Sequence, residues 1–220
     1  EAGADGYLTH PVDPAVLVAT VKALKYHGGM EVKSVTDDNP EALKKGLANL
    51  KRHLANLQQQ FNLPCVVAIN HFVHDRDSEI AMIEQAVTEM GGKVVLARHW
   101  AQGGAGAEQL AETVVAMLDQ QSGKSCELLY PDAMPLLEKI RTVAEKLYGA
   151  SDVIADGKVL KKLNDFTETY GDLPVCMAKT PYSFSSDPAL RGAPDNHSLT
   201  IRDVRLSHGA GFVVVLCGDI

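Results

Sequence analysis

Aromatic residues and paired cysteines are both scarce in this sequence. Only 5% of its 220 residues are aromatic, and Trp100 is the single tryptophan. Four cysteines are widely spaced and form no Cys-x-x-Cys pair: Cys65, Cys126, Cys176 and Cys217. This spacing predicts reduced thiols in a cytoplasmic protein, and disfavours a disulfide framework or a zinc ribbon. Because aromatic residues are so rare, each one that follows a buried strand is a candidate for ligand binding.

The sequence also lacks an excess of positive charge and a long apolar run. Its formal net charge is −7, which disfavours a uniformly basic surface for nucleic acid. No apolar stretch approaches the roughly 20 residues that a membrane span needs. The first residue is not methionine, and the last apolar run is followed by only four residues. We therefore expect part of a longer protein that binds neither nucleic acid nor a membrane.

Apolar runs alternate with amphipathic stretches along the first half of the chain. Continuous, β-branched runs of this kind are typical of strands buried on both faces of a parallel sheet, and they lie at residues 15–21, 64–70 and 93–98. A stripe of leucines predicts an amphipathic helix over residues 41–61. Further helices are predicted at 78–90 and 108–121. Strands alternating with helices indicate right-handed βαβ units.

The second half mixes helices and strands in a less regular order. Helices are predicted at 132–148 and 157–168, and strands at 173–178, 198–205 and 211–216. A polar stretch at 122–128 separates the two halves. We predict an α/β fold with a mostly parallel sheet flanked by helices over residues 1–122. A smaller α+β region is predicted over residues 123–220.

Ligands in open parallel sheets bind beyond the carboxyl ends of the strands, and three such ends carry distinctive residues. The first is residues 70–77, where Phe72 follows a buried strand. Taken alone, Phe72 is more often a core residue. His71 and His74 suggest metal ligands, but no third ligand lies at a suitable spacing, so we predict no metal site.

The second strand end, residues 98–106, contains Trp100 ahead of a glycine-rich loop. A planar heteroaromatic ligand could stack between Trp100 and Phe72, because the two follow neighbouring strands. The alternative is that Trp100 covers the sheet edge. The loop lacks the Gly-Lys-Ser/Thr ending of a phosphate-binding P-loop.

The third strand end, residues 179–187, places a lysine and several hydroxyl groups directly after a strand. Lys179, Thr180, Tyr182 and Ser183 could surround a phosphate or an adenine. The alternative is a surface turn rich in capping residues. No Ser-His-Asp set, Cys-His set or carboxylate pair is evident, so catalytic residues are not assigned.

Together these segments resemble the formate–tetrahydrofolate ligase family. The resemblance rests on five segments that match in order and spacing: residues 19–29 with their His-Gly-Gly ending, 66–72, 100–104, 173–183 and 204–212. It implies a portion of a P-loop NTPase-like core. It also implies that formate, ATP and tetrahydrofolate give 10-formyltetrahydrofolate, ADP and phosphate through formyl phosphate, with ATP bound together with Mg²⁺.

The resemblance further implies roles for particular residues. Phe72 and Trp100 would sandwich the pterin ring, with Leu96 lining the same pocket. The 179–183 segment would lie near the nucleotide or the formyl phosphate. The family also implies a homo-oligomer and a response to monovalent cations. It places the P-loop in the N-terminal part of the same protein, which would be the partner of this chain. We therefore expect the chain alone to be inactive.

The sequence departs from the family pattern in several places. Glu1-Ala2-Gly3 runs straight into Ala4-Asp5, where the family has a further stretch that carries another aromatic residue of the pterin pocket. Five signature positions also differ: His71 replaces arginine, Val73 proline, Gln102 lysine, Pro181 glutamine and His208 alanine. The lost arginine and lysine predict weaker anion binding. Two alternatives to the ligase therefore stay open, a non-catalytic folate-binding module and a domain that mainly builds an oligomer.

Overall fold

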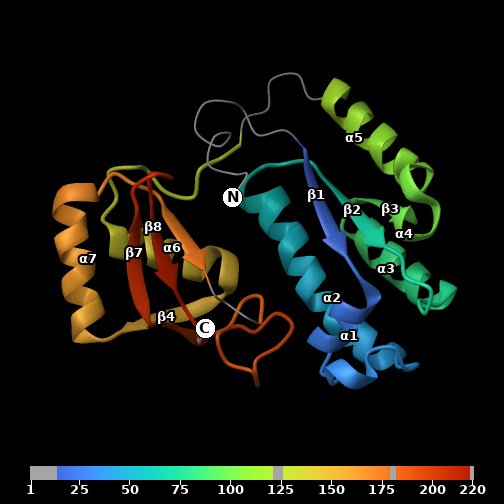
Figure 1. Cartoon of the computed structure of the whole chain (residues 1–220), viewed down its shortest axis with the longest axis horizontal. Helices are drawn as coiled ribbons and strands as arrows, with labels where there is room; N and C mark the ends of the chain where they lie inside the picture. The colour runs from blue at the N-terminus through green and yellow to red at the C-terminus, as the bar shows by residue number, and fades with distance from the viewer. Residues whose placement is uncertain (1–13, 121–125, 179–181, 219–220) are drawn as a thin grey trace. The chain divides into compact units, whose positions relative to one another are not determined.

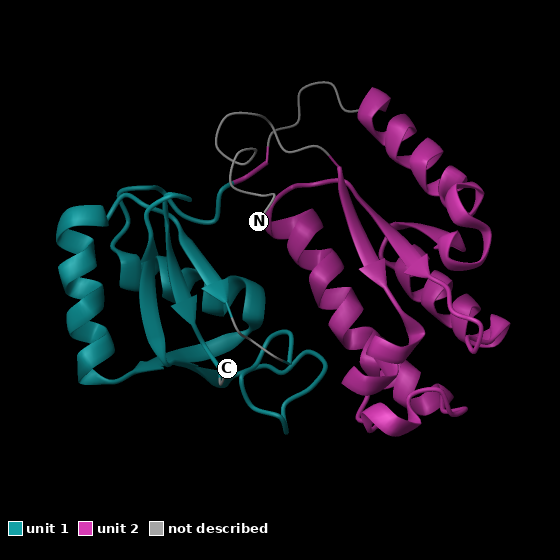
Figure 2. Ribbon diagram, in the orientation of Figure 1, with its two compact units in different colours: residues 1–10, 128–220 teal, residues 11–127 magenta. Residues whose placement is uncertain are grey.

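The computed structural model describes residues 14–120, 126–178 and 182–218. The chain divides into two compact units between residues 127 and 128 (Figure 2). The N-terminal unit ends at Glu127, and the C-terminal unit begins at Leu128. The domain boundary predicted at 122/123 falls beside residues 121–125, which lie outside the described part, so it stays a prediction. No helix of the described residues is long and apolar enough to cross a bilayer.

A parallel three-stranded sheet organises the N-terminal unit. Strand β2 (Cys65–Asn70) is central and pairs with β1 (Ala15–Ala19) and β3 (Lys93–Ala97) (Figure 1). One face packs against helices α1 (Val21–His27), α2 (Pro40–Ala55) and α3 (Asp77–Glu89). The other face packs against α5 (Glu108–Gln120) through Val66, Val95 and Met117. Both faces of β2 are therefore covered, which explains its unbroken apolar sequence.

Helix α2 carries the predicted leucine stripe. Leu43, Leu47, Leu50 and Leu54 are all buried in the core of their own unit. Asn39 caps the helix by accepting from Ala42 N–H at 2.9 Å, and Pro40 occupies its first turn. The helix continues as a π-helical turn, Asn56–Gln60. The stripe is thus accounted for by the core of this unit.

Helix α1 begins earlier than the apolar run suggested. Strand β1 ends at Ala19, and the Thr20 hydroxyl accepts from Ala23 N–H at 3.1 Å and starts a helix. The strand predicted over residues 15–21 therefore ends two residues earlier than predicted, and a helix follows it. A Cβ on Gly28 would lie 1.7 Å from Ala42 O. Only glycine permits this close approach of α1 to α2.

The C-terminal unit contains two small sheets around one core. Strand β4 (Ala150–Ala155) pairs in parallel with β6 (His197–Ile201). Strand β8 (Phe212–Leu216) pairs in parallel with β5 (Val175–Ala178) and antiparallel with β7 (Asp203–Ser207). Helices α6 (Leu136–Tyr148) and α7 (Gly157–Tyr170) contribute Ile140 and Leu163 to the common core.

The predicted α/β class is confirmed, with parallel sheets flanked by helices and a small mixed sheet. Two details of the C-terminal unit were missed. Strand β4 was not predicted, because Ser151 and Asp152 are exposed and interrupt its apolar pattern. The strand predicted at 198–205 is two strands, β6 and β7, that separate at Arg202.

Candidate functional site

The carboxyl ends of the three parallel strands meet at one edge of the N-terminal sheet. Ala19 of β1 is level with Ile69 of β2, and Ile69 is level with Leu96 of β3. The segments that follow these strands therefore start side by side. This edge, with the residues that follow β1, β2 and β3, is called the carboxyl edge below. It is where ligands bind in open parallel sheets.

Phe72 lies two residues beyond β2 in a closed turn. The Phe72 N–H donates to Asp75 Oδ2 at 2.8 Å, and the Asp75 N–H donates to Phe72 O at 2.9 Å. The Lys22 ammonium group, from the start of α1, lies 5.1 Å from the centre of the Phe72 ring. This distance is within the range of a cation–π contact. Phe72 is half-buried, so its position is fixed while part of its ring stays accessible.

Trp100 is the most exposed aromatic side chain at this edge. It is 76% exposed and lies in the short helix α4 (His99–Gln102), directly after β3. Among the described residues no aromatic ring packs against it. Burying an indole ring is favourable, so a tryptophan with this exposure offers an open stacking surface.

The glycine-rich segment after Trp100 returns to the end of β3. The Arg98 N–H donates to Gly106 O at 2.9 Å, and a Cβ on Gly106 would lie 2.4 Å from the Arg98 carbonyl carbon. Gly103 has φ 59° and ψ −140°, a conformation that essentially only glycine adopts. The glycines thus permit the tight backbone turn by which the segment after Trp100 returns to Arg98.

Leu96 lies on the opposite face of β3 from Val95. It is half-buried and packs against the core beneath α2 and α3. The three residues predicted for the pterin pocket therefore all lie at or near the carboxyl edge: Phe72, Leu96 and Trp100. Their role in binding a ligand stays a prediction.

Cationic groups that sequence reasoning did not assign also lie at the carboxyl edge. Arg98 Nη1 lies 3.4 Å from His71 Nε2. Because a guanidinium group only donates, His71 Nε2 is the acceptor in this contact. Within the described part of the chain, neither Lys22 nor Arg98 pairs with a carboxylate. The edge is therefore suited to an anionic ligand.

Asn70 ends β2 directly before this turn. Its Oδ1 atom is buried and has no hydrogen-bond partner among the described residues. An unpaired buried acceptor is costly, so such an atom commonly marks a place where water or a ligand completes the hydrogen bonding. No sequence pattern pointed to this atom, because asparagine at a strand end is ordinary.

A buried ion pair supports the base of α3 beneath the Phe72 turn. Lys25 of α1 is 1% exposed and pairs with Glu79 of α3, which is 2% exposed. Lys25 Nζ also donates to Asp37 O at 2.9 Å, and Glu79 Oε2 accepts from Arg76 N–H at 3.1 Å. The pair connects α1, the loop before α2 and the first turn of α3.

Two further observations bear on chemistry. In the described residues, no three His, Cys, Asp or Glu side chains are grouped as metal ligands would be. Burial raises the pKa of the Cys65 thiol to about 11 and that of Cys217 to about 12. Both thiols are thus protonated at neutral pH and are poor nucleophiles.

The third predicted segment belongs to the C-terminal unit. Lys179 and Thr180 lie outside the described residues, as does Pro181. The Phe184 N–H donates to Tyr182 O at 3.0 Å across Ser183, whose φ is 72°. This is a γ-turn with positive φ, a rare and strained conformation that is typical of functional segments.

Phe184 anchors that turn. It is 1% exposed and contacts the Tyr148 ring edge-on at 6.1 Å between centroids. Its carbonyl oxygen lies 2.8 Å from His197 Nε2, and because a carbonyl only accepts, Nε2 carries the proton. The residue that follows Ser183 is therefore anchored by its contacts with Tyr148 and His197.

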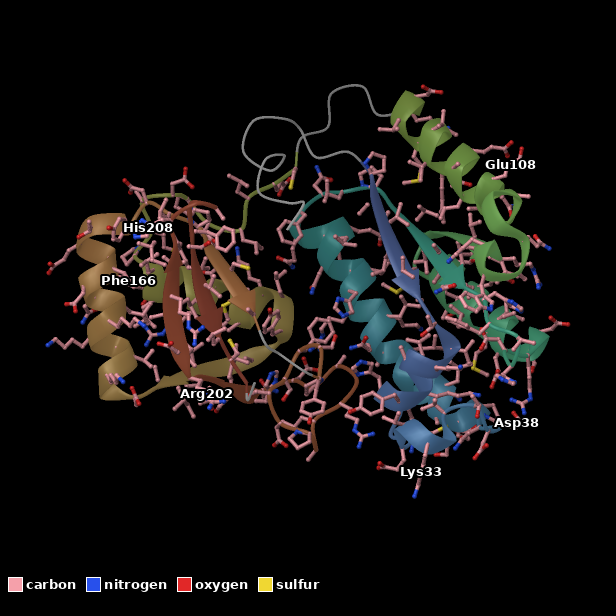
Figure 3. All side chains as sticks on the ribbon, viewed as in Figure 1. Lys33, Asp38, Glu108, Phe166, Arg202 and His208 are labelled. Carbon is pink, nitrogen blue, oxygen red and sulfur yellow. The ribbon has the colours of Figure 1, made fainter. Side chains whose placement is uncertain are left out.

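Gln102 and His208 are two of the positions that depart from the family pattern. Gln102 is exposed at the end of α4. His208 contacts Tyr170 edge-on at 5.6 Å, and Tyr170 also contacts Phe166 at 6.3 Å. Figure 3 labels His208 and Phe166. His208 itself is exposed.

Comparison with known proteins gives a consistent result. The sequence profile of the family described as formate–tetrahydrofolate ligase matches residues 7–220. Proteins named formate–tetrahydrofolate ligase from Mesorhizobium japonicum and Methylococcus capsulatus are 52% and 50% identical over 207 and 205 residues. The one from Rhizobium rhizogenes is 53% identical over 209 residues. The alignments cover 93–94% of this chain but 37% of each relative, so the chain spans little more than a third of their length.

Proposed function

Because this chain belongs to the formate–tetrahydrofolate ligase family, we propose that it is the folate-binding part of an ATP-dependent carbon–nitrogen ligase. The enzyme joins formate to tetrahydrofolate and releases ADP and phosphate. The observation that carries this proposal is the open indole face of Trp100 at the edge where Phe72 is held. A pterin is planar and polar at its rim, and stacking between two aromatic rings buries its faces while its rim stays hydrogen-bonded.

The proposed reaction has two steps. A formate oxygen attacks the γ-phosphorus of ATP, the bond to the bridging oxygen breaks, and ADP leaves with formyl phosphate bound. The folate amine then attacks the formyl carbon, phosphate leaves, and the amine loses a proton. Both steps depend on placing the reactants and neutralising phosphate charge. In this chain Phe72, Trp100 and Leu96 would orient the folate, and Lys22 and Arg98 would offer positive charge nearby.

Phosphate binding is assigned to two places. The P-loop would come from the preceding part of the ligase, together with the Mg²⁺ that accompanies ATP. The segment with Lys179, Thr180, Tyr182 and Ser183 would lie near the nucleotide or the formyl phosphate. The strained γ-turn at Ser183 and its buried anchor, Phe184, support a defined position for Tyr182 and Ser183. This division means that the chain alone should not turn over ATP.

We further propose a cytoplasmic homo-oligomer that responds to monovalent cations, as the family resemblance implies. The leucine stripe of α2 offers no surface for the oligomer, since Leu43 and Leu54 are 0% exposed in the core of their own unit. The alternative of an oligomer-building domain therefore has less support than the ligase. A non-catalytic folate-binding module is favoured only by the replacements at His71 and Gln102.

The folate site can be tested through the single tryptophan. Tetrahydrofolate that stacks on Trp100 should quench its emission, after correction for absorbed light with free N-acetyltryptophanamide. Phe72→Ala should weaken binding by roughly 1–3 kcal/mol if the ring forms the other face. Phe61→Ala is the matched control, because Phe61 precedes β2 and lies away from the carboxyl edge. Saturable quenching with the same dissociation constant in the native chain and in Phe72→Ala would contradict stacking of the pterin between Phe72 and Trp100.

Catalysis needs a second experiment. Residues 7–220 can replace the matching region of a full-length relative, which is about half identical. The ligase proposal expects this chimera to form 10-formyltetrahydrofolate from formate, ATP and tetrahydrofolate. A chimera that binds tetrahydrofolate but forms no product would favour the non-catalytic folate-binding module.

A further inference from the structure

The turn after β2 depends on one carboxylate. Asp75 closes the turn from both directions, since its Oδ2 accepts from Phe72 N–H and its own N–H donates to Phe72 O. A carboxylate is a stronger acceptor for a backbone N–H than a neutral group. In the described part of the chain, Asp75 forms no ion pair, although Arg76 is its neighbour. Among the described residues, the hydrogen bonds of Asp75 are thus made to the backbone of Phe72.

The Phe72 ring is also restrained from the side. The Lys22 ammonium group lies 5.1 Å from the ring centroid, and the ring is half-buried, so part of it stays accessible to a ligand. Pairing with β3 continues one residue past β2, because His71 N–H donates to Ala97 O at 3.0 Å. The backbone is therefore fixed at His71 by the sheet and at Phe72 by Asp75. Without Asp75, the sheet would hold the chain only up to the residue before the ring.

We propose that Asp75 is a positioning residue for folate binding, acting through Phe72. The inference rests on the proposed function, because it assumes that Phe72 stacks on the pterin. Stacking requires the ring to be within a fraction of an ångström of its bound position, and a residue that fixes its backbone lowers the ordering cost of binding. Asp75 itself need not touch the folate.

The test is a double-mutant cycle measured by tetrahydrofolate quenching of Trp100 in the 220-residue chain. Asp75→Ala should raise the dissociation constant about tenfold, which is the usual size of a lost charge-assisted hydrogen bond. Asp75→Asn should raise it by only about threefold, because the amide oxygen still accepts from Phe72 N–H. In the Phe72→Ala background, Asp75→Ala should add less than about twofold, since the ring it positions is gone.

His74→Ala is the matched control, because His74 is exposed in the same turn and does not form the hydrogen bonds that close it. Amide hydrogen exchange supplies a readout that does not need the ligand: Asp75→Ala should speed exchange at Phe72 N–H, and His74→Ala should not. Circular dichroism establishes that each variant is folded at the temperature of the titration.

Each result decides the inference. Native-like affinity in Asp75→Ala would overturn it, and so would an equal loss of affinity in the Phe72→Ala background. Those outcomes leave folate binding by the native chain intact. Absence of quenching in the folded native chain would instead overturn the proposed folate site, and the role of Asp75 with it.

Discussion

Within the described residues, each unit of this chain buries one lysine, and the two side chains have different kinds of partner. In the N-terminal unit, Lys25 is 1% exposed and faces the carboxylate of Glu79. In the C-terminal unit, Lys139 is 0% exposed and donates to two backbone carbonyls, Gly171 O at 2.7 Å and Leu173 O at 2.9 Å. Its ammonium group also lies 5.7 Å from the Tyr130 ring.

The difference shows what each lysine can do. Lys25 faces the carboxylate of Glu79, which Arg76 Nη1 also approaches at 3.6 Å, so opposite charges connect α1 to α3. Lys139 has only dipoles and a ring within direct contact, and burial lowers its pKa although Asp132 and Asp172 act in the opposite direction. Lys139 fixes the connection from α7 to β5 through the two carbonyls that it binds. The cost is a buried charge with no carboxylate in direct contact.

The largest expected effect comes from breaking the N-terminal pair. Glu79→Gln leaves Lys25 buried without a counter-charge, so we expect a loss of about 3–5 kcal/mol in the free energy of unfolding. Urea unfolding followed by Trp100 emission reports on this unit, because it holds the only tryptophan. The double variant Lys25→Met, Glu79→Leu should recover most of the loss, since it removes both charges at once. A double variant as unstable as Glu79→Gln would show that the packing of these two side chains, and not their charges, contributes the stability.

A smaller effect is expected from Lys139. Lys139→Met removes the buried charge but leaves the Gly171 and Leu173 carbonyls without a donor, so we expect a loss of about 1–3 kcal/mol. Unfolding of the C-terminal unit can be followed by amide exchange in α6 and β8. The matched control is Lys158→Met, because Lys158 is exposed in the same unit. If Lys139→Met lowered the free energy of unfolding as much as Glu79→Gln does, the two lysines would not differ in their contribution to stability.

The smallest expected effect is the loss of stability in acid, which should begin at a different pH in each unit. Burial first, and then His27 and Arg52, lower the pKa of His53 in α2 to about 4. Below its ordinary pKa of about 6.5 the unfolded chain binds a proton that the folded chain does not. The N-terminal unit should therefore lose stability as pH falls from about 6.5 towards 4, by about 1 kcal/mol at pH 5 after allowance for partial exposure.

Asp203 predicts that the C-terminal unit loses stability only at lower pH. A hydrogen bond from Lys162 at 2.9 Å lowers the pKa of this carboxyl below its ordinary value. Its contribution is therefore present above about pH 4 and is lost only as pH falls further. Urea unfolding at pH 7, 5 and 3.5 tests both units, and His53→Gln should flatten the response of the N-terminal unit between pH 7 and 5. Equal acid sensitivity of the two units would contradict this assignment.

Local patterns predicted the features that depend on neighbours in the sequence. The apolar runs around Val67 and Val95 became parallel strands, and the leucine stripe became the buried face of α2. Phe72 and Trp100 were identified as candidates because each directly follows such a strand. The family was recognised from the same segments, because their residues match in order and spacing.

The tertiary structure alone decided the features that join distant segments. Strand β4 forms through parallel pairing with β6, and no local periodicity announces it. Lys22 lies over Phe72, and Lys25 meets Glu79, because the parallel register places the ends of β1 and β2 at one edge. Sequence periodicity records which face of an element is buried, since burial selects apolar side chains at each turn or alternate residue. It does not record which remote partner a charged or aromatic side chain meets, because that depends on strand order and register.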